Sequence, residues 1–152
     1  MLRDLPELLD VIRSHRDSNF EGPQTEALVN AAERRLGLRF PPSYRAFLLA
    51  LGAGQFGSNE IYGVFRADFD DSGIPDTVWA TLDRRRSFEL ERSGVVIGYD
   101  GSEGFYVLDV GRRGADETVP VVWWTPGAIL EASPVVAPDF HAFLAQLADQ
   151  LD

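Results

Sequence analysis

Proline and glycine residues divide the segment from residue 33 to residue 63 into two helices and a strand, and this order restricts the folds open to the chain. A helical run ends at Gly37, because glycine readily takes the left-handed conformation that closes many helices. Pro41 and Pro42 then interrupt the helix, and proline is favoured at the start of a new one. The segment therefore predicts a helix, a sharp break and a second helix.

The second helix is short. The spacing i, i+3, i+4 and i+7, which marks one apolar helix face, is occupied by Tyr44, Phe47, Leu48 and Leu51. We expect this helix over residues 43–51 with Ser43 as its N-cap, since a serine hydroxyl can accept a free backbone N–H. Glycines at positions 52, 54 and 57 then form a loop, and residues 60–65 predict a strand.

The rest of the chain predicts further helices around a run of strands. Apolar residues at helical spacing indicate helices over residues 5–12, 24–36, 76–90 and 140–151, the last with Asp139 as its N-cap. Polar residues predict turns or loops over residues 17–22 and 67–75. Strands are predicted over residues 95–99, 105–110 and 119–125, with turns at 100–104 and 111–118.

The short turns between these strands leave no room for parallel crossovers, so the strands predict an antiparallel meander. Helices that precede and follow such a meander are typical of the α+β class. We therefore expect one α+β domain over residues 1–152, in which N-terminal helices and a C-terminal helix pack on the sheet.

Composition narrows the functional classes. The chain has 24 acidic and 14 basic residues, a formal charge of −10 and no cysteine. This charge repels nucleic-acid phosphates and attracts basic partners. The N-terminus lacks the basic-then-apolar order of a signal peptide, and no apolar run approaches the length of a membrane span. These features predict a cytoplasmic monomer or weak dimer that binds neither nucleic acid nor membrane.

The order of motifs resembles the SUKH superfamily of Smi/Knr-like proteins over about residues 25–147. The matching residues are Glu33, Leu36-Gly37, Phe40-Pro41, Tyr44, Phe47, Leu48, Ile61-Tyr62-Gly63, Asp100-Gly101, Tyr106-Val107-Leu108-Asp109 and the helix at 140–144. A Gly-Gly pair of the family is split here by Ala53. The resemblance implies a mostly non-enzymatic domain without a catalytic set, whose bacterial members often act as immunity proteins that neutralise toxins.

Two motifs imitate ligand sites. Residues 52–57 spell G-x-G-x-x-G, but they follow a predicted helix, whereas a dinucleotide fingerprint follows a strand. The acids of the loop at 68–76 have the spacing of a calcium-binding loop. The glutamate that binds calcium through both oxygens is absent, because its position is occupied by Trp79. We interpret the glycines as turn residues and the loop as a solvated acidic surface, with calcium binding as a remote alternative.

Catalytic and metal-ligating residues are not predicted. His15 and His141 lack ligand spacing, and the absence of cysteine removes thiolate chemistry. The cluster at 84–86 is basic but has acidic neighbours, which favours ion pairs within the chain. Adjacent strand residues face opposite sides, so Trp123 and Trp124 cannot both enter a one-sided core, and one of them could anchor a partner. No catalytic residue, metal or cofactor is therefore expected.

Our leading hypothesis is an immunity protein that binds a basic toxin domain, such as a nuclease, through an acidic face. The expected acidic contacts are Asp68, Asp70, Asp71, Asp100, Glu103, Asp116 and Glu117, and the expected aromatic anchors are Tyr99 and Trp124. A regulatory scaffold of the same fold without a toxin partner is the main alternative. An enzyme or a calcium-dependent module is a more distant one.

Overall fold

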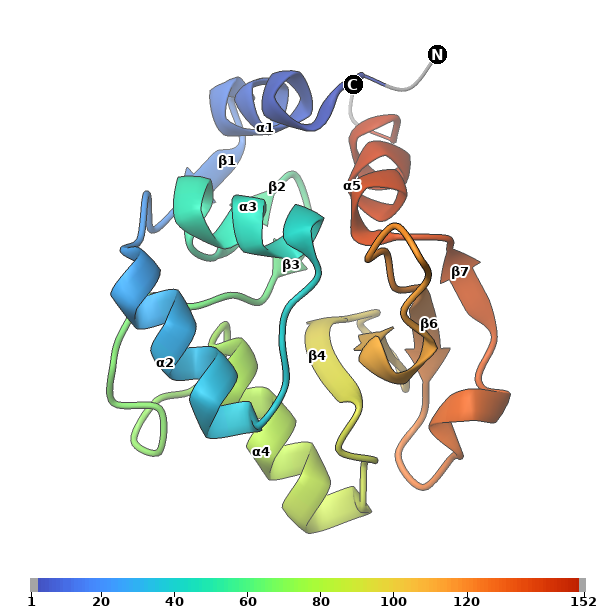
Figure 1. Ribbon diagram of the computed structural model, residues 1–152. Helices are drawn as coiled ribbons and strands as arrows, with labels where there is room; N and C mark the ends of the chain where they lie inside the picture. Colours follow the sequence, from blue (N-terminus) through green and yellow to red (C-terminus); the bar gives the residue numbers. More distant parts are fainter. Residues whose placement is uncertain (1–2, 151–152) are drawn as a thin grey trace.

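A computed structural model describes residues 3–150, which form helices and short strands (Figure 1). The α-helices are α1 (Leu5–Ser14), α2 (Glu26–Leu36), α3 (Pro42–Leu51), α4 (Thr77–Phe88) and α5 (Phe140–Ala148). The strands are β1 (Ser18–Phe20), β2 (Gly54–Phe56), β3 (Asn59–Ile61), β4 (Gly94–Tyr99), β5 (Phe105–Asp109), β6 (Val121–Trp124) and β7 (Val135–Ala137). Two 3₁₀ turns, η1 (Val110–Arg112) and η2 (Leu130–Ala132), complete the order.

Most helix boundaries follow the capping residues that the sequence indicates. The side chains of Thr25, Asp76 and Asp139 accept backbone N–H groups in the first turns of α2, α4 and α5. Gly37 ends α2 with φ of 75°. Helix α5 ends at Ala148, and the predicted extension to residue 151 reaches outside the described residues.

The prediction of Ser43 as an N-cap is wrong. Helix α3 begins at Pro42 and its N-cap is Pro41, with no capping hydrogen bond from a side chain. Proline has a preset φ angle and no N–H to satisfy, so Pro42 suits the first helical position and leaves no need for a hydroxyl cap one residue later.

The α+β class is confirmed, but the strands form two antiparallel sheets rather than one. Strands β4 to β7 form a four-stranded meander, and β1 to β3 form a small three-stranded sheet. The prediction was wrong for residues 17–22, which contain β1, and for the glycine loop, which contains β2. It also missed β7 and extended β3 too far, because β3 ends at Ile61.

Gly54 shows why a glycine segment forms a strand here. Its φ is 154°, and a Cβ atom at this position would lie 2.2 Å from the carbonyl oxygen of Asn19. Strand β1 therefore approaches β2 more closely than any larger residue would permit. The backbone N–H of Tyr62 then donates to the carbonyl of Ile97 at 2.8 Å and ties the end of β3 to β4.

The four-stranded sheet is buried on both faces. Alternate residues of β4, β5 and β6 point to opposite sides, so each strand contributes to two hydrophobic clusters. The first cluster packs the sheet against α1, α3 and α5 through Val95, Ile97, Leu108 and Val121. The second cluster packs the other face against α4 through Val96, Val107, Val122 and Trp124. We expected a core on one face of the sheet, but the structure has a hydrophobic cluster on each face.

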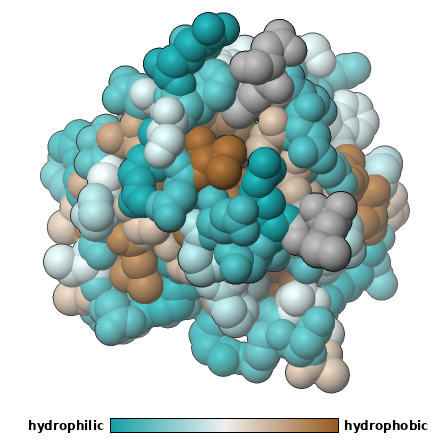
Figure 2. Space-filling model, turned by 90° about the horizontal axis from the view of Figure 1, so that it is seen from above, coloured by the Kyte–Doolittle hydropathy of each residue, from teal (hydrophilic) through white to brown (hydrophobic). Residues whose placement is uncertain are grey.

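The surface above α1 and α5 is mostly polar. Figure 2 shows hydrophilic residues over most of this end, with hydrophobic residues in small, separate patches. Helix α4 lies at the opposite end of the molecule (Figure 1). Between residues 3 and 150, none of the helices combines the length and the apolar character that a membrane crossing requires.

Candidate functional site

A groove of about 520 Å³ opens between α4, the end of β3 and the hairpin of β4 and β5. Three of its lining residues are exposed large hydrophobic side chains: Ile74, Phe88 and Tyr99, with 45%, 40% and 44% of their surface accessible. The apolar lining of this aromatic groove consists of Tyr62, Ile74, Phe88, Tyr99, Phe105 and Pro126. Apolar side chains that gather in one concave site are typical of ligand and partner sites.

The aromatic groove is continuous with the second hydrophobic cluster. The ring of Phe105 lies 5.0 Å from that of Tyr99 and 6.2 Å from that of Trp124, measured between centroids. Tyr99 is exposed, Phe105 is half-buried and Trp124 is fully buried. The three rings therefore connect the surface to the core and give the groove a rigid wall.

Arg84 lines the groove, and the carboxylate of Asp83 offsets its positive charge. Its guanidinium lies 4.9 Å from the centroid of Phe105 and 5.5 Å from that of Phe88, a cation–π arrangement with both rings. It also pairs with Asp83 at 2.8 Å, and only 18% and 21% of the two side chains are exposed. Arg84 thus supports the aromatic wall while Asp83 offsets its charge.

Two exposed carboxylates lie among the lining residues of the groove. Glu60 and Glu103 line it and take part in no ion pair among the residues that the structure describes. Burial, reinforced by the nearby charge of Glu60, raises the pKa of Tyr62 to about 12. The groove therefore combines apolar walls with a net negative charge.

The hairpin loop, residues 100–104, is held by Asp100. Its Oδ1 accepts the backbone N–H groups of Ser102, Glu103 and Gly104 at 2.8, 3.1 and 3.1 Å. Its Oδ2 accepts the indole N–H of Trp123 at 2.7 Å. These hydrogen bonds lower the pKa of Asp100 to about 2. The carboxylate that we expected to contact a partner thus fixes the loop that carries Glu103.

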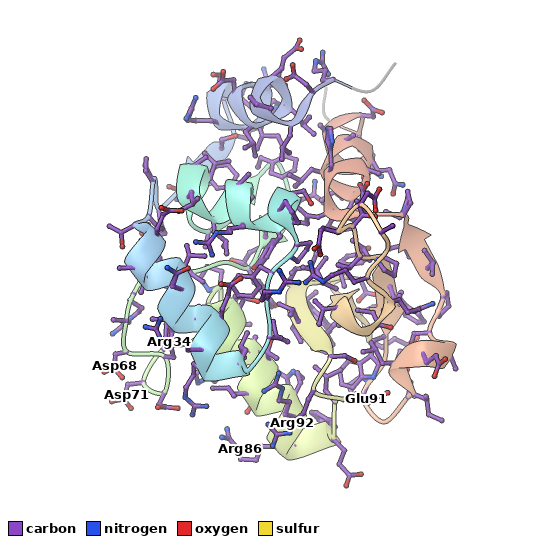
Figure 3. The ribbon with its side chains drawn as sticks, in the orientation of Figure 1. Arg34, Asp68, Asp71, Arg86, Glu91 and Arg92 are labelled. Carbon is purple, nitrogen blue, oxygen red and sulfur yellow. The ribbon has the colours of Figure 1, made fainter. Side chains whose placement is uncertain are left out.

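The three acids between β3 and α4 lie elsewhere. Asp68, Asp70 and Asp71 are exposed, and Figure 3 places Asp68 and Asp71 beside α2 at the margin of the molecule. Asp70 forms an ion pair with Arg35 of α2 at 3.0 Å. An exposed pair of this kind contributes little to stability, about 0–1 kcal/mol. None of the three lines the aromatic groove.

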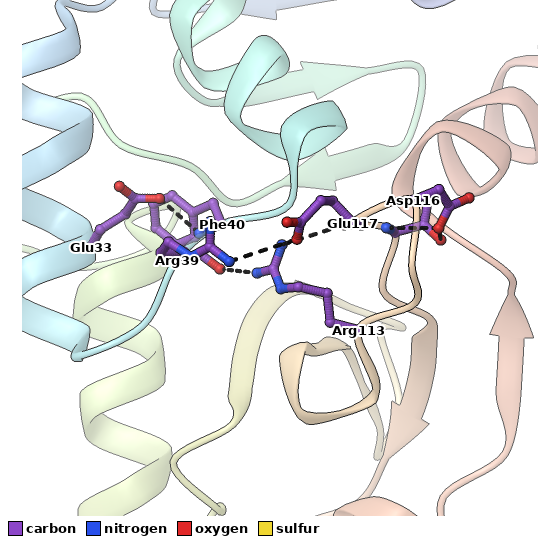
Figure 4. Close-up of polar contacts among 7 residues, drawn as sticks. Glu33, Arg39, Phe40, Arg113, Asp116 and Glu117 are labelled. Carbon is purple, nitrogen blue, oxygen red and sulfur yellow. Dashed lines mark hydrogen bonds and ion pairs between the residues drawn. The ribbon is translucent and has the colours of Figure 1, made fainter.

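The acids between β5 and β6 belong to a third region. Asp116 accepts hydrogen bonds from the hydroxyl and N–H of Thr118, which lower its pKa. Glu117 pairs with Arg113 at 3.1 Å and with Arg39 at 3.7 Å (Figure 4). Arg113 also donates to the carbonyl of Arg39, so this loop is fastened to the connection between α2 and α3.

The structure therefore brings together only part of the predicted contact set. Tyr99 and Glu103 meet in the aromatic groove, next to Asp100, whereas the other acids lie in two separate loops. The prediction that Trp124 is an exposed anchor is wrong. Its side chain is 0% exposed, and its indole N–H donates to the carbonyl of Ala128 at 2.9 Å. A sheet covered on both faces leaves no open side for this tryptophan.

Several groove residues were not predicted, because they come from segments far apart in the sequence. One signal was available: Ala80, Arg84 and Phe88 recur at i, i+4 and i+8, the spacing of one helix face. The basic cluster at 84–86 was interpreted as a set of ion pairs within the chain, and Asp83 does pair with Arg84 and Arg86. Arg85 instead donates to the carbonyl of Leu36, at the end of α2.

Metal binding receives no support from the side-chain geometry. Among residues 3–150, no group of three or more His, Asp or Glu side chains is placed to hold a metal ion. In the loop that imitates a calcium site, Asp76 is fully buried and caps α4 through its Oδ1. The glycine motif at 52–57 ends α3 and enters β2, an order that differs from that of a dinucleotide fingerprint.

Comparisons with known proteins agree with this fold. A crystal structure of a protein from Pseudomonas syringae pv. tomato superposes with a TM-score of 0.65 over 95% of this chain and 96% of that chain, at 15% identity. At this identity the likeness shows the fold alone. No curated protein matches the chain. The family model described as SMI1-KNR4 cell-wall (SUKH_6) matches residues 26–144, from α2 to α5. The chain therefore belongs to the SMI1-KNR4 family of the SUKH superfamily.

Proposed function

We propose that the protein is an immunity protein that binds a basic toxin domain stoichiometrically and blocks it without catalysing a reaction. The observation that carries the proposal is the aromatic groove, in which exposed apolar side chains accompany Glu60 and Glu103, two carboxylates that form no ion pair within residues 3–150. Membership of the SUKH superfamily supports it, because the sequence resemblance implies toxin neutralisation for many bacterial members.

The charge of the whole chain supports the same proposal. At −10, the protein attracts a basic domain and accelerates its approach. A toxin nuclease binds a polyanion and is expected to present a basic surface for that purpose. An acidic protein that occupies this surface competes with the nucleic acid, which gives inhibition without chemistry.

The test starts from the adjacent reading frame: if this frame encodes a small basic domain, that domain is co-expressed with this chain. We expect growth to be rescued and the two purified proteins to form a one-to-one complex by calorimetry. Rescue without complex formation would contradict the blocking mechanism. A stable complex without rescue would contradict the immunity role and favour a regulatory scaffold of the same fold.

The matched variants are Glu103→Lys in the groove and Asp71→Lys, the same change of charge outside it. Both positions are exposed, so neither substitution should disturb the core, and circular dichroism checks that both variants fold. We expect Glu103→Lys to weaken the complex and Asp71→Lys to weaken it much less. Equal effects of the two variants would argue against the groove as the contact site.

A further inference from the structure

We propose that the aromatic groove binds a partner segment in which an apolar side chain is flanked by arginine or lysine. The inference rests on the proposed function only in that the partner is a basic protein. It adds which side chains of that partner the groove binds, and neither the family nor the overall charge determines these side chains. Three properties of the groove carry it: its exposed apolar side chains, its two carboxylates without an ion pair in the described part of the chain, and its fixed hairpin loop.

The apolar part of the occupant follows from the exposed side chains. Ile74, Phe88 and Tyr99 come from three different segments, yet they converge on one groove. Each keeps at least 40% of its surface accessible, which is unfavourable in water unless a partner covers it. An aliphatic or aromatic side chain that enters between them removes this surface from water, as buried anchors do in protein interfaces.

The basic part of the occupant follows from the charges. Asp83 offsets Arg84, so Glu60 and Glu103 set the net charge of the groove. A lysine or arginine beside the apolar anchor can pair with either carboxylate. An arginine can also stack on the exposed ring of Tyr99. An acidic segment would instead meet two carboxylates of its own sign.

A second copy of the chain is a less suitable occupant. Two molecules that each carry −10 repel one another, and Glu60 and Glu103 would have to approach acidic surface. The hairpin loop is also fixed before any partner arrives, because Asp100 holds Ser102, Glu103 and Gly104 by their backbone N–H groups. A preformed site of this kind loses little conformational freedom when a short segment binds.

The experiment uses the full chain and two synthetic peptides, without any toxin. The probe is acetyl-Gly-Arg-Leu-Phe-Arg-Gly-amide, and the control peptide has glutamate in place of both arginines. Binding is measured by calorimetry and mapped by ¹⁵N NMR. We expect the basic peptide to shift the amide signals of Ile74, Phe88, Tyr99 and Glu103, and the acidic peptide to shift none of them.

Two pairs of variants isolate the two recognition elements. Tyr99→Ala and Glu103→Lys should each weaken peptide binding by about tenfold, the effect expected for an interface anchor. Their controls are Ile129→Ala, an apolar truncation at another exposed site, and Asp71→Lys, the same change of charge in the β3–α4 loop. Both controls should bind like the unchanged protein.

Three results would overturn the inference: no binding of the basic peptide, equal binding of both peptides, or equal loss with Asp71→Lys and Glu103→Lys. Self-association detected by sedimentation and abolished by Tyr99→Ala would assign the groove to a second copy and overturn it as well. Failure of toxin rescue alongside specific peptide binding would reject the immunity role and leave the groove assignment standing.

Discussion

Asp100 shows how hydrogen bonds within the chain allow a single carboxylate to fix the shape of a site. Its two oxygens accept N–H groups from three backbone positions and from Trp123. The loop glycine Gly104 is needed as well, since a Cβ atom there would lie 2.0 Å from the indole nitrogen of Trp123. An Asp-Gly turn was predicted from the sequence, but its bond to a tryptophan 23 residues away was not.

The hydrogen bonds to Asp100 predict a pH effect. Its pKa is lowered from 3.8 to about 2, so the folded state holds the charged form more strongly than the unfolded state does. The stabilisation is therefore present above pH 3.8 and is lost as pH falls through about 2. Urea unfolding of the protein and of Asp100→Asn should differ at pH 6 and converge near pH 2. Parallel curves over this range would contradict the prediction.

Asp76 predicts the opposite dependence. Burial raises its pKa above 3.8, so its contribution to stability falls as pH rises from that value through the raised pKa. Its Oδ1 caps α4, whereas its Oδ2 has no partner among the described residues. Asp76→Asn keeps the capping oxygen and removes the buried charge, so it should be at least as stable at pH 7.

The matched variant for this prediction is Asp76→Ala, which loses the cap as well as the charge. It should be about 1 kcal/mol less stable than Asp76→Asn, because the two variants differ in the cap and not in the charge. Thermal unfolding at pH 7 and pH 4.5 measures both variants. A less stable asparagine variant at pH 7 would show that the ionised carboxylate is favourable in its buried position.

Among the elements, α4 contributes Arg84 and Phe88 to the groove wall, and its position is fixed by two buried threonines. Its side chains Thr77 and Thr81 bond both backbone groups of Val96: Thr77 donates to the carbonyl at 2.5 Å, and Thr81 accepts the N–H at 2.9 Å. These bonds fix α4 on β4, and with it Arg84 and Phe88. The geometry of the groove thus depends on two threonines that lie inside the protein.

Replacement of Thr81 by valine tests this attachment. The change keeps the shape of the side chain but leaves the buried N–H of Val96 without its acceptor. The expected cost is about 1–3 kcal/mol of unfolding free energy, measured in urea. The control Thr125→Val, at a half-buried position outside α4, should cost less. Equal losses would mean that the bond to Val96 is unimportant.

The sequence predicted some elements far better than others. The long elements carry repeated signals: α2 and α5 have both a capping side chain and an apolar face, α4 has a capping side chain, and β4 and β5 have a turn between them. Strands β1, β2 and β7 have only three residues each, too few for an alternating pattern. They form because the fold places them beside their partner strands. A pattern within a few consecutive residues does not show this pairing.

Strand β7 also illustrates how this sheet ends. It lies at the edge of the four-stranded sheet and is enclosed by Pro134 and Pro138. Proline cannot donate to a neighbouring strand, and a short strand offers few bonds to another chain. The edge is therefore protected against sheet-to-sheet association, in agreement with the monomer or weak dimer that we predict.

At the scale of the whole molecule, the net negative charge could be predicted from the sequence, whereas the groove could not. Composition identified the net charge, but seven candidate acids could not be sorted into those that bond within the chain and those that do not. Only the folded arrangement shows that Asp100 and Glu117 are engaged internally while Glu60 and Glu103 line an apolar groove.

The whole-molecule charge predicts a salt effect on association. Attraction between a chain at −10 and a basic partner accelerates their encounter at low salt and is screened as salt rises. Stopped-flow measurements should show the association rate falling about tenfold or more between about 50 and 500 mM salt. The dissociation rate should change much less. A salt-independent association rate would contradict electrostatic attraction as the cause.

The neighbouring aromatic rings of the groove give the protein an optical property of its own. All three tryptophans lie in or beside this half of the molecule: Trp79 and Trp124 in the second cluster, and Trp123 under the hairpin loop. Phe105 joins the exposed Tyr99 to the buried Trp124. We therefore expect intrinsic emission excited at the indole band to change when a guest occupies the groove, so that a fluorescence titration of the unlabelled protein measures the occupancy.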